Sequence, residues 1–218
     1  MKKEILLKLE DMHTFTVESY MQITGLSENE KPIGLNQLAR AEKNGQIFRI
    51  KRGLYITGEF YRKYYQDERF LPAISQMLYP ESYVSTLFVL QKKNIIPEAT
   101  YVTTGITWKN TMEYNNRIGR FKYQHINPQL YLGFEMFEFV NFSYYQATPA
   151  KALFDFLYLK PIDRKQRKLA SFLGQELRLN LDEFTPDQKK EFKFYVEMSQ
   201  SEKMEMIYSN LEHHKWQH

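Results

Sequence analysis

The chain has 218 residues, enough for one compact domain and a smaller module, and 43% of them are apolar, which excludes an intrinsically disordered protein. Thirty basic and 26 acidic residues leave a net charge of +4, which permits an anionic partner without requiring one. Cysteine is absent, which excludes disulfides and thiolate metal sites, and no run of eighteen apolar residues predicts a membrane span. We therefore expect a cytoplasmic protein with no membrane partner.

Two short helices are expected at the start of the chain. Residues 2–11 place Ile5 and Leu9 at helical spacing, and Thr16 is suited to cap a second helix. The following segment, residues 26–32, is longer and more acidic than the tight turn of a minimal helix-turn-helix. A third helix then follows.

Residues 34–44 are expected to form that third helix, with Gly45 as a left-handed cap. Its predicted core-facing residues are Leu35, Leu38, Ala39 and Ala41. Its opposite face carries side chains suited to base edges and phosphates, namely Asn36, Gln37, Arg40, Lys43 and Asn44. A solvated helix face would look similar, but the next segment favours a recognition helix.

Residues 46–57 are expected to form a basic β-hairpin with its turn at Arg52 and Gly53. Alternation points Phe48, Ile50 and Tyr55 inward and Arg49 and Lys51 outward. Arg49, Lys51 and Arg52 give the segment a charge of +3 without an acidic residue, which suits a phosphate backbone. The alternative is an edge hairpin protected by charge. Residues 1–58 carry nine basic and seven acidic side chains, so binding would depend on where the positive charges lie.

The rest of the chain predicts a second unit. Residues 60–67 are aromatic and basic, which is typical of packing at a domain joint. Helices are expected over 70–78, 83–93, 150–159 (capped by Thr148), 186–198 and 202–211, and strands over 100–104, 121–126, 130–134 and 136–142. We therefore expect an α+β fold: an N-terminal winged helix-turn-helix with linker (1–66), then a C-terminal domain (67–218) with a small, mostly antiparallel sheet packed by helices.

Evidence for catalysis is weak in this sequence. Asp155 lies in an apolar helix that would raise its pKa, but a lone carboxylate there is typically paired with a local basic residue or tyrosine. No P-loop, nucleophile elbow, dinucleotide fingerprint or clustered acidic motif is present. We expect neither enzymatic activity nor a cofactor or metal.

A second basic cluster contains Arg164, Lys165 and Lys168. These three residues would share one flank of a helix. A solvated face explains such a cluster, and the functional alternative is contact with flanking DNA, with RNA or with an acidic partner surface.

Six segments in this order resemble the AbiEi antitoxins. They are residues 51–56 (KRGLYI), 82–90 (SYVSTLFVL), 96–98 (IPE), 102–104 (VTT), 119–126 (GRFKYQHI) and 147–159 (ATPAKALFDFLYL). The resemblance spans most of the chain between the hairpin and about residue 180. The chain departs from the family pattern at Ala150, where an acidic residue is expected, and in its long segment before Gly34.

The resemblance implies a phage-defence (abortive-infection) or plasmid-maintenance protein of a type IV toxin-antitoxin system. In that family a winged helix binds double-stranded DNA repeats upstream of its own operon and represses it. The C-terminal domain neutralises an AbiEii-like nucleotidyltransferase toxin. Two alternatives stay open: a stand-alone winged-helix transcriptional regulator with a ligand-sensing or dimerisation domain, and a nucleic-acid-processing enzyme that uses Asp155.

Overall fold

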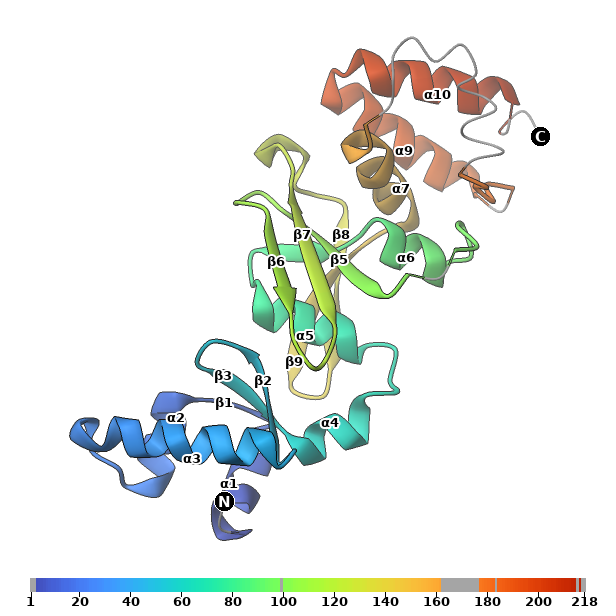
Figure 1. Cartoon of the computed structure of the whole chain (residues 1–218). Coiled ribbons are helices and arrows are strands. Elements are labelled where there is room, and N and C mark those ends of the chain that lie inside the picture. The colour runs from blue at the N-terminus through green and yellow to red at the C-terminus, as the bar shows by residue number, and fades with distance from the viewer. Residues whose placement is uncertain (1–2, 99, 162–176, 183, 215, 217–218) are drawn as a thin grey trace.

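The computed structural model describes residues 3–98, 100–161, 177–182, 184–214 and 216. Up to residue 64, the elements are α1 (Lys3–Glu10), β1 (Thr14–Thr16), α2 (Val17–Thr24), the 3-10 turn η1 (Glu28–Glu30), α3 (Lys31–Lys43), β2 (Ile47–Lys51), β3 (Leu54–Thr57) and α4 (Gly58–Tyr64). The three strands form a small antiparallel sheet with β3 in the centre, and α2 and α3 lie against it (Figure 1).

Local chemistry explains where the first helices begin and end. The hydroxyl of Thr16 accepts a hydrogen bond from the backbone N–H of Ser19, which confirms the expected N-cap of α2. Gly45 has a φ of +68° just after α3, so the expected left-handed cap is also confirmed. Helix α3 begins three residues earlier than expected because Pro32 fits the first turn of a helix.

Helix α3 contacts α2 through a narrower stripe than the sequence suggested. Gly34, Leu38 and Ala41 are buried, and the absence of a side chain at Gly34 lets α2 approach closely. Leu35 and Ala39 are exposed, so their assignment to the core was wrong. The buried residues follow the i, i+4, i+7 spacing of a single seam, and Leu35 and Ala39 lie beside it.

The β2–β3 hairpin forms as expected, but a bulge between Arg49 and Lys51 breaks the simple alternation. Ile47 and Ile50 are both buried although they are three residues apart, and Phe48 is half-buried. Arg49 is exposed, whereas Lys51 is half-buried. The prediction that Arg49 and Lys51 share one outward face is therefore wrong for Lys51.

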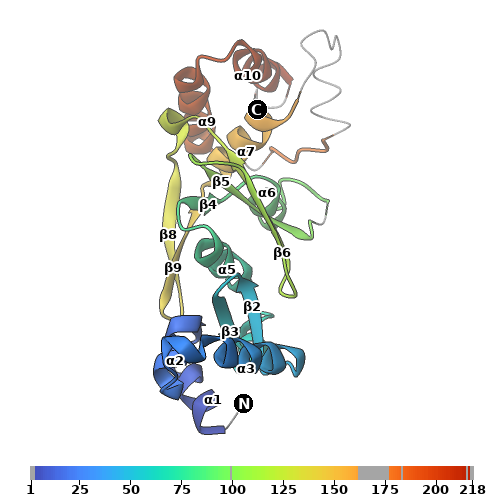
Figure 2. The same cartoon turned by 60° about the vertical axis from the view of Figure 1, so that its left-hand side comes forward.

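After α4 the described chain forms a six-stranded sheet with helices. Its elements are α5 (Phe70–Leu78), β4 (Ser82–Val84), α6 (Leu87–Lys92), β5 (Val102–Thr107), β6 (Met112–Asn115), β7 (Arg120–His125), the 3-10 turn η2 (Pro128–Leu130), β8 (Phe134–Phe139), β9 (Phe142–Ala147), α7 (Pro149–Leu159), α9 (Pro186–Ser199) and α10 (Glu202–His214). The strand order is β6-β7-β5-β4-β9-β8, and the sheet curls around α5 (Figure 2).

The α+β class is confirmed, but the expected small, mostly antiparallel C-terminal sheet is a larger mixed sheet. β5 runs parallel to β7, and β4 runs parallel to β9. Residues 83–93, expected to be helical, contribute β4 before α6 begins, because Ser82–Val84 add to the sheet between β5 and β9. Residues 130–134 are mostly not a strand, and 136–142 are split by the β8–β9 turn, where Val140 has a φ of +55°.

The last helices form a layer on α7. Thr148 accepts a hydrogen bond from the backbone N–H of Lys151, so the predicted cap and the buried α7 are confirmed. The predicted packing of helices on the sheet does not hold for α9 and α10. α9 packs on α7, and α10 packs on α9. Phe194 and Met198 of α9 are exposed.

One hydrophobic cluster, here called the joint cluster, spans the predicted domain boundary at residues 66–67. It joins the hairpin and α4 to α5 and the large sheet through Ile50, Ile56, Phe60, Phe70, Ala73, Ile74, Leu78, Phe121, Tyr123, Phe139 and Tyr144. Phe60 is 3% exposed, and its ring centroid lies 6.0 Å from that of Phe70 and 6.2 Å from that of Phe139. The aromatic packing expected for residues 60–67 is therefore confirmed.

Phe60→Ala should lower the free energy of unfolding by about 3–5 kcal/mol, because it removes a fully buried ring and leaves a cavity in the joint cluster. Urea unfolding followed by circular dichroism measures this change. Tyr65→Ala, at a half-exposed aromatic just after α4, is the matched control and should have a much smaller effect. Equal losses from both variants would contradict the role given to the joint cluster.

Candidate nucleic-acid interface

The outward face of α3 carries the residues predicted to read nucleic acid. Asn36, Gln37, Arg40 and Lys43 are all exposed. Gln37 accepts a hydrogen bond from the Tyr20 hydroxyl at 2.6 Å, which anchors its side chain to α2. Within the part of the chain that the structure describes, Arg40 and Lys43 form no ion pair, so their charges are available to a partner.

The exposed apolar residues of α3 share this face. Leu35, Ala39 and Lys43 follow one another at intervals of one turn, so the two apolar side chains lie along the edge of this face. Small apolar side chains next to amide and guanidinium groups can contact the methyl group of thymine in a major groove. The structure thus groups apolar and polar side chains that suit base edges along one helix face.

The hairpin places two of its three basic residues next to α3. Arg49 is exposed, and its Nε lies 3.9 Å from the carboxylate of Glu42 on α3. Arg52 is exposed at the turn. An ion pair at that distance between an exposed arginine and a half-buried glutamate is weak, so it orients Arg49 beside α3 without neutralising it.

Lys51 is occupied within the protein. Its ammonium donates hydrogen bonds of 3.0 Å to the carbonyl oxygens of Met77 and Leu78, the last residues of α5. Burial lowers the pKa of Lys51, and the nearby charge of Glu81 opposes that shift. Lys51 satisfies carbonyls at a helix C-terminus and ties the hairpin to α5. Its ammonium is thereby directed toward α5, although Lys51 lines the same groove as Arg49 and Arg52.

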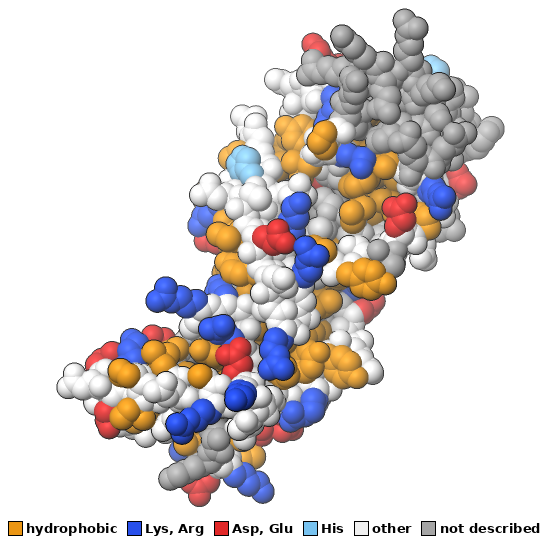
Figure 3. Space-filling model, in the orientation of Figure 1, with side chains coloured by type: hydrophobic (Ala, Val, Ile, Leu, Met, Phe, Trp, Pro, Cys, Tyr) orange, Lys and Arg blue, Asp and Glu red, His pale blue; other side chains and the backbone are white. Residues whose placement is uncertain are grey.

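A groove of about 520 Å³ lies between the hairpin and the turn that joins β6 to β7. Its lining combines the N-terminal part of the chain (Glu42, Arg49, Ile50, Lys51 and Arg52) with Tyr114, Asn115, Asn116 and Arg117. Figure 3 shows Lys and Arg side chains gathered over α3, the hairpin and the tip of the β6–β7 turn. Sequence reasoning missed Arg117, because nothing local indicates that residue 117 folds back onto residues 42–52.

Asp155 belongs to a buried polar network. Its carboxylate accepts a 2.7 Å hydrogen bond from the ammonium of Lys151 and further hydrogen bonds from the hydroxyls of Tyr83 and Ser85. Lys151 and Asp155 are fully buried, and Lys151 also donates to the carbonyl oxygen of Leu130. Burial raises the pKa of Asp155, opposed mainly by the charge of Lys151. The expected local pairing of Asp155 is confirmed, and this geometry suits a structural role.

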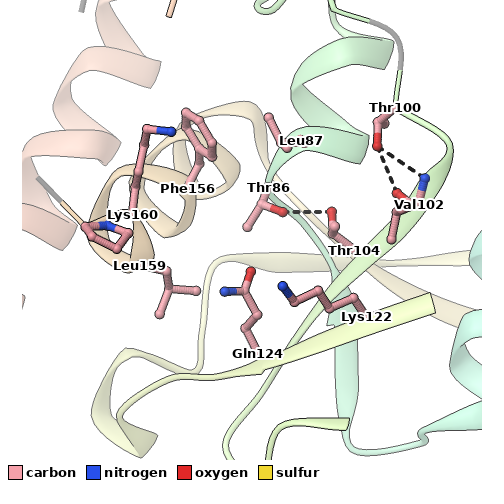
Figure 4. A pocket seen from close by; sticks show the side chains of 11 residues that line it. Thr86, Leu87, Thr100, Val102, Thr104, Lys122, Gln124, Phe156, Leu159 and Lys160 are labelled. Carbon is pink, nitrogen blue, oxygen red and sulfur yellow. Dashed lines mark hydrogen bonds between the residues drawn. The ribbon is translucent and has the colours of Figure 1, made fainter. Parts of the chain in front are cut away.

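A pocket of about 310 Å³ opens between β5, β7 and the C-terminal end of α7 (Figure 4). Lys122 and Gln124 point into it from β7. Thr86 has a φ of +54°, which is costly for a β-branched residue, and its hydroxyl donates to Thr104 at 2.7 Å. The apolar wall is formed by Leu87, Val102, Phe156, Leu159 and Pro161. The pocket suits a small, mainly apolar ligand with an anionic group.

Three further features bear on function. The second basic cluster, Arg164, Lys165 and Lys168, lies outside the described residues. Among the described residues, no group of three histidine or acidic side chains is placed to hold a metal ion, and no helix has the length and apolar character needed to cross a bilayer.

No protein-family model matches this sequence, and no curated protein matches it either.

Asp155→Asn should lower the free energy of unfolding by about 3–5 kcal/mol, because it leaves the buried ammonium of Lys151 without its counter-charge. The double variant Lys151→Met/Asp155→Leu should recover much of that loss. Asp187→Asn, in an exposed pair with Lys190 in the first turn of α9, is the control and should cost no more than about 1 kcal/mol. Full stability of Asp155→Asn in denaturant titrations would contradict the structural role.

Proposed function

We propose that the chain is a DNA-binding antitoxin that represses its own operon and neutralises a nucleotidyltransferase toxin. The observation that carries the DNA-binding part is the exposed polar face of α3 beside the exposed Arg49 and Arg52 of the hairpin. The order of elements, three helices and a small sheet that ends in a hairpin, supports a winged helix-turn-helix for this part.

In this proposal α3 enters the major groove of double-stranded DNA. Asn36 and Gln37 have the donor and acceptor pair that matches adenine, and Arg40 matches guanine. Lys43, Arg49 and Arg52 neutralise backbone phosphates. From the sequence, Lys51 was predicted to contact the phosphate backbone of DNA. It instead fixes the hairpin to α5, so it affects DNA binding by holding Arg49 and Arg52 in position.

The antitoxin part rests on the resemblance to the AbiEi antitoxins. Several of the segments that carry it occupy well-defined places in the fold: residues 82–90 form β4 and most of α6, and residues 119–126 contain β7. The departure at Ala150 has a physical explanation, because this residue is completely buried and an acidic side chain there would be desolvated. The resemblance thus supports a toxin-neutralising role for the C-terminal part.

A second candidate function is a stand-alone regulator whose C-terminal part senses a ligand. The pocket beside Thr86 and Lys122 favours it. Filling that pocket with Val102→Trp should change the DNA affinity of such a regulator. In an antitoxin whose pocket is unused, the same variant should leave DNA affinity unchanged.

Arg49→Ala/Arg52→Ala should weaken binding to duplex DNA of any sequence and lower the slope of log affinity against log salt by on the order of two, one unit for each lost phosphate contact. Fluorescence anisotropy with a labelled duplex from upstream of the gene, at several salt concentrations, measures this slope.

Two controls separate the roles of hairpin and helix. Lys190→Ala/Lys193→Ala removes the same charge from α9 and should leave the slope unchanged. Arg40→Ala should reduce discrimination between the upstream duplex and a scrambled duplex by about 1–3 kcal/mol. If the hairpin variant retains the slope of the unmodified protein, the hairpin has no part in DNA binding.

Co-expression of this chain with a neighbouring nucleotidyltransferase gene should restore growth that the nucleotidyltransferase alone arrests. The full chain is needed, because truncation near residue 67 would cut through the joint cluster. Arg49→Ala/Arg52→Ala should still restore growth while it releases repression of a reporter fused to the upstream DNA. Growth arrest that persists despite soluble full-length protein would refute the antitoxin role.

A further inference from the structure

Arg117 lies at the tip of the β6–β7 turn, and this turn reaches the N-terminal part of the chain. The guanidinium donates a hydrogen bond of 3.3 Å to the carbonyl oxygen of Glu42, near the end of α3. It also lies 5.9 Å from the ring centroid of Phe48 on β2. Arg117 therefore sits against the same helix and hairpin whose exposed residues carry the proposed DNA contact.

The turn that carries Arg117 is held in place on both sides. The side-chain oxygen of Asn116 accepts hydrogen bonds from the backbone N–H groups of Ile118 and Gly119, which closes the turn. The side-chain amide of Asn116 donates a 2.7 Å hydrogen bond to the carbonyl oxygen of Ile50 on β2. This contact fixes the turn on the hairpin, so Arg117 has a defined position relative to Arg49 and Arg52.

The groove between them is strongly positive. Its lining contains Arg49, Lys51, Arg52 and Arg117 against the single acidic residue Glu42, which leaves a net charge of +3. Arg117 forms no ion pair with any described residue, and one hydrogen bond to Glu42 engages only one of the five N–H donors of a guanidinium. The remaining donors can bind a phosphate oxygen in the planar, two-point geometry that arginine favours.

We infer that this groove holds a backbone phosphate of duplex DNA, with Arg117 as a DNA contact supplied by the C-terminal part of the chain. This inference rests on the proposed function, since it places the phosphate beside a DNA-bound α3. It extends the interface across the predicted boundary at residues 66–67. The DNA-binding surface is then complete only when the hairpin and the β6–β7 turn are packed together.

Salt-dependent binding of the full-length protein to two labelled duplexes tests the inference. One duplex contains the DNA upstream of the gene, and the other is a scrambled sequence of equal length. Arg117→Ala should lower the salt slope by about 0.9 and weaken binding to both duplexes about fivefold at 0.15 M salt, as expected for one lost phosphate contact. Arg120→Ala removes the same charge from the same hairpin outside the groove and should change neither quantity.

A second variant separates phosphate contact from docking of the turn. Asn116→Ala removes the hydrogen bonds of Asn116 to Ile50, Ile118 and Gly119 but keeps the charge of Arg117. The contacts of Arg117 with Glu42 and Phe48 still hold the turn against α3 and β2, so this variant should retain the salt slope if Arg117 contacts phosphate directly. A slope lowered as much by Asn116→Ala as by Arg117→Ala would assign the effect to docking and overturn the inference. Circular dichroism and thermal unfolding verify that each variant is folded.

The outcomes distinguish this inference from the proposed function. If Arg49→Ala/Arg52→Ala lowers the slope and Arg117→Ala behaves like Arg120→Ala, the groove does not hold phosphate, although the proposed DNA binding stands. If neither change affects affinity or slope, the hairpin has no part in DNA binding, and the inference fails together with that part of the proposed function.

Discussion

The packing of Phe60 in the joint cluster determines how the two parts of the chain face each other. Its ring is buried between the hairpin, α5 and the β8–β9 hairpin, and aromatic rings of this size contribute large buried areas and edge-to-face contacts. Because the cluster fixes the hairpin against the large sheet, Lys51 reaches the end of α5 and the β6–β7 turn reaches α3. The positive groove exists only as a consequence of this packing.

Placement of charge, more than its amount, makes the surface suitable for an anionic partner. Residues 1–58 carry a net charge of only +2. The fold exposes the basic side chains of Arg40, Lys43 and Arg52, so their charges can reach an anionic partner. The ammonium of Lys51 is instead bound to backbone carbonyl oxygens. In contrast, the Lys151–Asp155 pair is buried and neutral overall, so it organises the C-terminal core without contributing to the surface potential.

Features set by local chemistry could be predicted from the sequence. The caps at Thr16 and Thr148 and the glycine after α3 follow from side-chain hydrogen bonding and backbone freedom within a few residues. The exposure of Asn36, Gln37, Arg40, Lys43 and Arg49 followed from helix and strand periodicity, and that of Arg52 from its place at the turn.

Features set by distant contacts could not be predicted. The strand β4 forms only because β5 and β9 lie on either side of it, and the bulge in β2 shifts Lys51 toward α5. Arg117 joins the candidate site through contacts between residues that are 66 and 75 positions apart. Periodicity within a short segment carries no information about such pairings.

Cross-linking of the full-length protein to photoreactive duplex DNA, followed by identification of the linked peptides, tests directly whether α3 and both turns contact DNA. We expect links from α3, from the β2–β3 turn and from the β6–β7 turn. Links confined to α9 and α10, or no links at DNA concentrations that saturate binding, would contradict this expectation.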